Sequence, residues 1–212
     1  MSEANNDTSE LLRRAGAGDQ GAVGDLFDRH RDRLRRMVQL RMDRRLQGRV
    51  DPSDVLQEAY LGFARSLADY LQNPGTSLYL WLRLIAARKL QALHRHHLGT
   101  HMRAAGREVS LHRGALPQAS SVSLAAQLLG RFPSPSEAAV RAELQIHVQE
   151  ALNRMDPIDR EVLALRHFEQ LSNVETAQVL GLSAAAASNR FVRALRHLKD
   201  ILASVPGGME LL

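Results

Sequence analysis

The chain has 212 residues, of which 44% are hydrophobic and 4% aromatic, and it carries a formal net charge of +5. This apolar content excludes a disordered chain, and the absence of cysteine excludes disulfide and thiolate chemistry. The basic excess is consistent with a polyanionic partner such as nucleic acid. Because Leu, Ala and Val carry most of the apolar content and no segment alternates β-branched residues over the length of a strand, we expect an all-α protein.

The N-terminal segment is polar and acidic, unlike a signal peptide, and no apolar run approaches the ~20 residues of a membrane span. We therefore expect a cytoplasmic protein without membrane insertion. Charge is distributed unevenly along the chain. Residues 81–113 contain seven Arg or Lys against one acid, whereas residues 51–69 contain four acids against one Arg. This alternation indicates two surfaces with different partners, nucleic acid for one and protein for the other.

In the first half, apolar residues at helical spacing predict four helices after a disordered tail over residues 1–7: residues 8–16, 20–46, 51–70 and 76–96. The third has the clearest start, with a capping Asp followed by Pro at residues 51–52. Its polar side aligns Asp54, Gln57 and Glu58, a strip that is either simply solvated or a docking surface. The fourth helix carries the only tryptophan, Trp81, which is either a core anchor or part of an aromatic and basic surface for single-stranded DNA.

In the second half, Gly, Pro and Ser break the helical pattern repeatedly between residues 98 and 133. We predict a linker there, with room for short helices near residues 100–107 and 123–129. Helices over residues 134–154 and 156–169 follow, the second with Ile158 on its inward face. The predicted organisation is two small helical domains and their connection: a first domain over residues 8–97, a linker over 98–133 and a second domain over 134–204.

Residues 171–199 contain two short predicted helices separated by a tight turn. Ser172 and Glu175 have capping-box spacing at the start of the first helix. Gly181 suits the sharp stop between the helices, and Ser183 can cap the second. The predicted buried residues are Val174, Ala177 and Leu180 in the first helix, and Ala187, Phe191, Ala194, Leu195 and Leu198 in the second.

The opposite face of that second helix is polar and basic, with Ser188, Asn189, Arg190, Arg193 and Arg196. Two capped helices around a glycine turn are typical of a helix-turn-helix, here over residues 172–199, whose second helix enters the major groove of DNA. The alternative is an ordinary helical hairpin with a solvated basic face.

Four histidines cluster near the end of the fourth predicted helix: His94, His96, His97 and His101. Three of them would share one face if the helix continued through Gly99, and imidazole is a common metal ligand. Because no acid or Cys partner lies nearby in the sequence, we expect neither a metal site nor another cofactor, and we interpret the cluster as a polar helix end that faces DNA.

Two sequence blocks resemble sigma-70 family RNA polymerase sigma factors of the extracytoplasmic-function (ECF) type. Residues 54–60 (DVLQEAY) and 79–86 (YLWLRLIA) are similar to the region 2 pattern, a D-x-x-Q-E helix followed by a W-L-x-x-I-A helix. Residues 152–156, 160–163 and 171–198 are similar to region 4. The resemblance covers most of residues 10–203 outside the predicted linker, and it implies a promoter-specificity subunit that is not an enzyme.

The resemblance implies partners for each block. The partners would be bacterial core RNA polymerase and promoter DNA, and an anti-sigma factor is a further candidate. Asp54, Gln57 and Glu58 would dock on the clamp coiled coil of the largest catalytic subunit. The melted −10 strand would be held by the fourth helix, through Trp81, Arg83, Arg88 and Lys89, with the loop over residues 72–77 as the base pocket.

The second helix of the helix-turn-helix would read the −35 element. By alignment, Ser188, Asn189 and Val192 would face the bases, while Arg190, Arg193 and Arg196 would lie nearer the phosphates. Asn189 is the first candidate for sequence readout because an asparagine amide pairs with the N6 and N7 atoms of adenine. Many relatives carry Arg or Lys in place of Ser188 and polar residues in place of Ala184 to Ala187, so readout here is expected to be sparse and to depend on DNA shape.

Two other functions remain open from the residues alone. A stand-alone helix-turn-helix repressor or activator would bind duplex DNA as a dimer, but it has no need of the block over residues 54–86. A metal hydrolase built on the histidines would need a nucleophile and base or a phosphate-binding loop, and the sequence shows neither.

Overall fold

The computed structural model describes residues 2–46, 48–98, 118–129 and 138–203. Every regular element in these ranges is a helix, so the predicted all-α class is confirmed. The chain divides into two compact units, Met1–Glu108 and Val109–Leu212. Among the described helices, none combines the length and the hydropathy needed to cross a bilayer.

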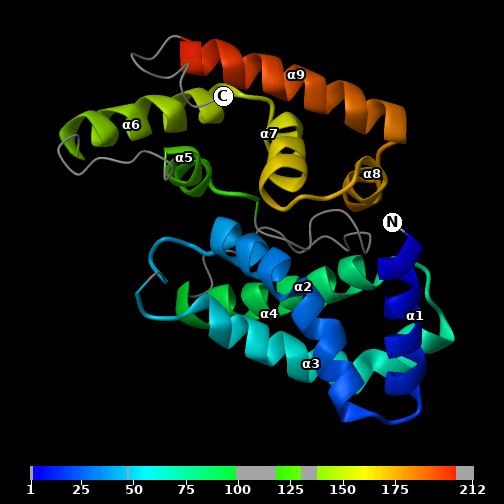
Figure 1. The fold of residues 1–212 in the computed structure, drawn as a ribbon. Helices are drawn as coiled ribbons and strands as arrows, with labels where there is room; N and C mark the ends of the chain where they lie inside the picture. Colours follow the sequence, from blue (N-terminus) through cyan, green and yellow to red (C-terminus); the bar gives the residue numbers. More distant parts are fainter. Residues whose placement is uncertain (1, 47, 99–117, 130–137, 204–212) are drawn as a thin grey trace. The chain divides into compact units, whose positions relative to one another are not determined.

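The first unit contains helices α1 (Ser2–Gly16), α2 (Gln20–Arg41), α3 (Pro52–Gln72) and α4 (Leu78–Leu98), drawn from blue to green in Figure 1. Helices α2, α3 and α4 contact one another in all three pairs, and α1 packs on α2 and α3. Their shared core is aliphatic and aromatic, with Phe27, Leu34, Leu56, Phe63, Leu82 and Leu90 fully buried. Helices α3 and α4 approach closely at Gly62, where an added Cβ would lie 2.9 Å from Cγ2 of Ile85.

Two boundaries in this unit differ from the sequence prediction. Helix α1 begins at Ser2 rather than Thr8, so residues 2–7 of the predicted tail are helical. Asp7 and Thr8 both accept hydrogen bonds from Arg29, which ties this segment to α2. Helix α2 ends at Arg41 rather than Leu46 because Met42 is extended. The apolar spacing misled the prediction here, since Leu46 is buried although it lies in a turn.

The second unit contains α5 (Ser121–Leu129), α6 (Ala138–Arg154), α7 (Pro157–Leu163), the π-helical turn η3 (Ala164–Phe168), α8 (Asn173–Leu180) and α9 (Ala184–Ala203). Helix α9, drawn in orange to red in Figure 1, contacts α6, α7 and α8. Helix α5 packs on α6 and buries Leu124, Ala125 and Leu129, and it falls within the segment predicted as a linker. The helix predicted near residues 100–107 and the start predicted at Ser134 lie outside the described residues.

Three residues predicted to face inward in this unit are exposed instead: Ile158, Val174 and Leu195. Val174 is the largest departure, with 59% of its surface exposed. Helix α8 buries Thr176 and Ala177 in its place, and the Thr176 hydroxyl donates to the carbonyl oxygen of Ser172 at 2.9 Å. The buried stripe of α9 is narrower than predicted, with Ala187, Ala194 and Leu198 inside and Phe191 half-buried.

Candidate polymerase and nucleic-acid interfaces

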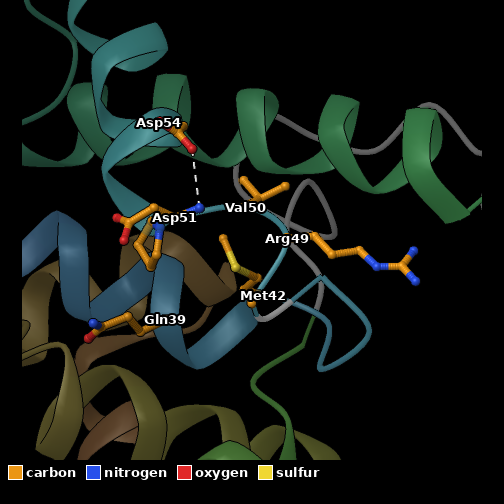
Figure 2. A pocket seen from close by; sticks show the side chains of 8 residues that line it. Gln39, Met42, Arg49, Val50, Asp51 and Asp54 are labelled. Atoms are coloured by element: carbon orange, nitrogen blue, oxygen red, sulfur yellow. Dashed lines mark hydrogen bonds between the residues drawn. The ribbon is translucent and has the colours of Figure 1, made fainter.

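The start of α3 is fixed by a reciprocal capping box. The Asp51 carboxylate accepts from the Ser53 backbone N–H at 2.7 Å, and the Asp54 carboxylate accepts from the Asp51 N–H at 3.1 Å. Figure 2 shows the second bond beside a pocket of about 610 Å³ lined also by Met42 and Val50. The N-terminus of α3 therefore borders an open hollow, and Asp54 has a structural part in its own helix.

The strip predicted on α3 is exposed along its length. Asp54, Gln57 and Glu58 all lie on the solvent side of the helix, and the exposed apolar Leu61 continues the same face one turn on. Glu58 pairs with Lys89 of α4 at 3.2 Å. The strip predicted for polymerase and a cation predicted for the −10 strand thus meet at one edge of this unit.

The aromatic residue predicted for the −10 strand lies at the junction of α3 and α4. The Trp81 ring is half-buried, with its centroid 5.8 Å from that of Tyr70. The Tyr70 hydroxyl donates to the carbonyl oxygen of Thr76 at 3.3 Å, so α3 is tied to the loop before α4, and burial raises the pKa of Tyr70. Trp81 is therefore a packing residue whose side chain is only partly exposed and whose indole nitrogen is buried.

The three basic residues predicted for the −10 strand do not share one surface. Arg88 is exposed and lies two turns from Trp81 on the same side of α4. Lys89 is half-buried in its pair with Glu58. Arg83 differs from the surface position that its predicted role requires, because only 4% of its surface is exposed. It stands about 200° around the helix from Trp81, on a side of α4 that is buried within the first unit.

The histidine cluster separates into a buried and an exposed part. His94 is buried, and its Nε2 accepts from the Asp43 backbone N–H at 3.2 Å, which joins the segment after α2 to α4. Burial lowers the pKa of His94, and the Asp43 charge opposes this only in part. His96 and His97 are exposed with ring centroids 4.7 Å apart. His101 lies outside the described residues, among which no three potential metal ligands gather.

The helix-turn-helix forms with the predicted caps. Ser172 and Glu175 make a reciprocal capping box at the start of α8. Gly181 ends that helix in the left-handed conformation, φ 61° and ψ 40°, which a glycine adopts without a Cβ penalty. At α9 the Ser183 hydroxyl accepts from the Ala186 N–H at 3.1 Å, and the Asn173 side-chain amide donates to the carbonyl oxygen of Ala184 at 2.8 Å. These bonds fix the direction in which α9 leaves the turn.

The residues predicted to face DNA divide into two groups on α9. Ser188, Asn189, Val192 and Arg196 are exposed. Arg190, which is half-buried, and Arg193, which is also exposed, both bond Asp159 of α7, whose side chain is only 5% exposed. The sequence prediction missed Asp159 because its partners lie 31 and 34 residues away and its own position reads as an ordinary first-turn acid.

Comparison with known proteins identifies the family. The family model described as sigma-70, region 4 matches residues 146–198, a range that includes α8, the turn and most of α9. The RNA polymerase sigma factor CarQ of Myxococcus xanthus is 30% identical over 185 residues, which are 87% of this chain and 91% of CarQ. The chain belongs to the sigma-70 family of RNA polymerase sigma factors.

Two further comparisons refine the assignment of this sigma factor. The ECF RNA polymerase sigma factor BldN of Streptomyces coelicolor is 25% identical over 193 residues, which are 91% of this chain and 65% of BldN. A solved structure of CnrH, a sigma factor of Cupriavidus metallidurans, in complex with the cytosolic domain of CnrY is 25% identical with a TM-score of 0.53, and the match covers 92% of this chain and 96% of CnrH. This sigma factor is of the ECF type.

Membership in the family settles the function class. The chain is a transcription initiation factor that works with core RNA polymerase at promoter DNA, and it is not an enzyme. The metal hydrolase and the stand-alone repressor are therefore set aside. The family leaves open which side chains of this sigma factor make each contact.

Proposed function

We propose that α9 reads the −35 element through Ser188, Asn189 and Val192, with Arg196 on a phosphate. The observation that carries this assignment is the exposure of the first three side chains within about 100° of one helix face. That face belongs to a helix whose start is fixed by two capping bonds. An asparagine amide can pair with adenine, and an apolar side chain can contact the thymine methyl group. This sigma factor would therefore favour A·T pairs at the contacted positions.

The first unit supplies the other promoter contact in this proposal. Trp81, Arg88 and Lys89 would hold the melted −10 strand, with the loop over residues 72–77 receiving a flipped base. The support is the partly exposed Trp81 side chain, whose ring contacts Tyr70, and the exposed Arg88 on the same side of α4. Arg83 is left out because it is buried.

Core polymerase would dock on the exposed strip of α3, formed by Asp54, Gln57 and Glu58. Acidic and amide groups suit a basic partner helix, for which they give register and a faster association. The strip ends at the exposed Leu61, which adds the apolar contact that a stable interface needs. The predicted first domain, residues 8–97, would carry this strip and the −10 contacts, and the predicted second domain, residues 134–204, the −35 contact; α1 extends the first to Ser2, and α5 adds to the second.

We also place this sigma factor in the cytoplasm, where its polymerase and DNA are found. The related CnrH is known in complex with the cytosolic domain of CnrY. By analogy, an anti-sigma protein that covers the helices of this chain is a candidate partner, and co-purification of a bound protein from the native host would support it.

The experiment that tests the −35 assignment replaces one amide. Holoenzyme is used to select a promoter from a pool with a randomised −35 window, and affinity is then measured for every single base-pair change. We expect Asn189→Ala to lose roughly 1–3 kcal/mol of discrimination at one A·T pair and to leave the other pairs unchanged. Asn153→Ala, the same substitution on α6, is the control; because Asn153 accepts a hydrogen bond from Ser121 at 2.7 Å, its free energy of unfolding is measured beside its affinity. An unchanged profile for Asn189→Ala would remove this residue from base readout.

A further inference from the structure

The carboxylate of Asp159 holds both arginines that flank the reading face of α9. Its Oδ1 accepts from Arg190 at 2.7 Å and from Arg193 at 2.8 Å, and its Oδ2 accepts from Nε of Arg193. Asp156 adds a longer contact with Arg190 at 3.3 Å. Two arginines of the recognition helix are therefore paired with two acids at the start of α7.

The pairing is stronger than a surface ion pair because its acceptor is buried. The Asp159 side chain is 5% exposed, whereas Arg190 and Arg193 are 26% and 60% exposed. Burial raises the pKa of Asp159, but the hydrogen bonds from Arg193 and Arg190 outweigh it, so the pKa lies below its ordinary value. Charge-assisted bonds to a shielded carboxylate are roughly twice as strong as neutral ones, and removing one partner leaves a buried charge.

An arginine that is not paired with an acid can contact DNA in two ways. On a recognition helix it either forks onto O6 and N7 of guanine or binds phosphate in any sequence. Two nitrogens of Arg193, Nε and one terminal nitrogen, donate to Asp159, so this edge of the guanidinium is directed toward α7. Of the three arginines predicted near phosphates, only Arg196 lies outside this cluster on the exposed side of α9.

We propose that Asp159 is a positioning residue that sets the DNA specificity of this sigma factor. It withholds Arg190 and Arg193 from DNA, so that discrimination falls to Ser188, Asn189 and Val192. The proposal rests on the proposed role of α9 in −35 binding, and it replaces the phosphate contacts predicted for the two arginines. Asp159 itself touches no DNA in this account.

The test measures how holoenzyme affinity depends on NaCl concentration. The probes are one duplex selected from the pool with a randomised −35 window and the same duplex with that window scrambled. Each phosphate contact contributes about 0.9 to the slope of log affinity against log salt concentration. Asp159→Asn is compared with the triple variant Asp159→Asn, Arg190→Gln, Arg193→Gln, which removes the whole cluster with similar shapes and leaves no unpaired buried charge.

We expect Asp159→Asn to steepen the slope by about 1–2 and to lower the ratio of selected to scrambled affinity by roughly tenfold, because it frees arginines for sequence-independent contacts. The triple variant should return both values to those of the wild type. The proposal is overturned if Asp159→Asn changes neither value, or if the triple variant has a slope lower than wild type by about 1 or more, which would mean that at least one of the two arginines already binds phosphate. If Asp159→Asn fails to unfold cooperatively, the slope of the triple variant decides alone.

Two controls separate this inference from the function on which it rests. Arg196→Gln should lower the slope by about 1 without changing the ratio, and Asn189→Ala should lower the ratio without changing the slope. If neither control has an effect, α9 does not contact DNA, and the proposed function and the inference both fail. If the controls behave as expected and the Asp159 variants do not, only the inference fails.

Discussion

Several side chains in this sigma factor combine a structural contact within their unit with a proposed contact to polymerase or DNA. Asp54 caps its own helix and also begins the strip proposed for polymerase. Arg190 and Arg193 belong to the recognition helix but bond a carboxylate of α7. Residue type and spacing therefore locate the candidate surfaces. The hydrogen-bond and ion-pair partners within the chain determine which side chains of each surface can still bind polymerase or DNA.

Two glycines give a matched test of packing. At Gly62 an added methyl group would lie 2.9 Å from Ile85, whereas at Gly24, also within a helix, nothing lies within 4 Å. We expect Gly62→Ala to lower the free energy of unfolding by roughly 1–3 kcal/mol through overpacking. Gly24→Ala should raise it by up to about 1 kcal/mol, because alanine favours the helix. Urea denaturation checks both; equal effects would contradict the close approach of α3 and α4.

His94 predicts acid sensitivity of the first unit. Burial lowers its pKa in the folded state, and its Nε2 accepts a hydrogen bond that only the neutral ring can accept. The unfolded chain therefore binds more protons, and stability is lost as pH falls below the unfolded pKa of about 6.5 toward the lower pKa of the folded state. Urea denaturation at pH 7.5 and 5.5 should show this loss, and His94→Gln should reduce it. The exposed His96→Gln is the control; if both variants behave alike, the assignment is wrong.

At the scale of helices, the sequence predicted most elements and missed what long-range contacts decide. Caps are local, so the starts of α3, α8 and α9 follow from Asp51, Ser172 and Ser183. The predicted end of α2 was wrong because the buried Leu46 lies in a turn and not in the helix. The burial of Arg83 and the partners of Asp159 depend on neighbours distant in the sequence, and no local pattern signals them.

The strip on α3 can be separated from the cap of the same helix. Asp54→Ala should lower both the free energy of unfolding, by roughly 0.5–1 kcal/mol through the lost cap, and the affinity for core polymerase. Gln57→Ala should lower only the affinity. Glu58→Ala should do the same, since an exposed pair such as Glu58–Lys89 adds little stability. Urea denaturation and a core-binding titration give the two readouts. Full core affinity in Gln57→Ala and Glu58→Ala would place the docking surface elsewhere.

For the whole molecule, each of the two helical units has its own proposed promoter element, the −10 element for the first and the −35 element for the second. The first combines an exposed acidic strip with an aromatic and basic edge, and the second presents a helix-turn-helix. A stand-alone repressor needs only the second of these. The proposed function therefore requires both units to act on one promoter while core polymerase carries them.

The most direct measurement of this claim is run-off transcription by core polymerase with and without the chain. The template is a promoter selected from random DNA, together with versions in which the −10 or the −35 window is scrambled. We expect transcripts only when the chain is present, and a large loss from scrambling either window. Promoter-independent output, or tight duplex binding by the chain alone with no effect on core polymerase, would contradict the account.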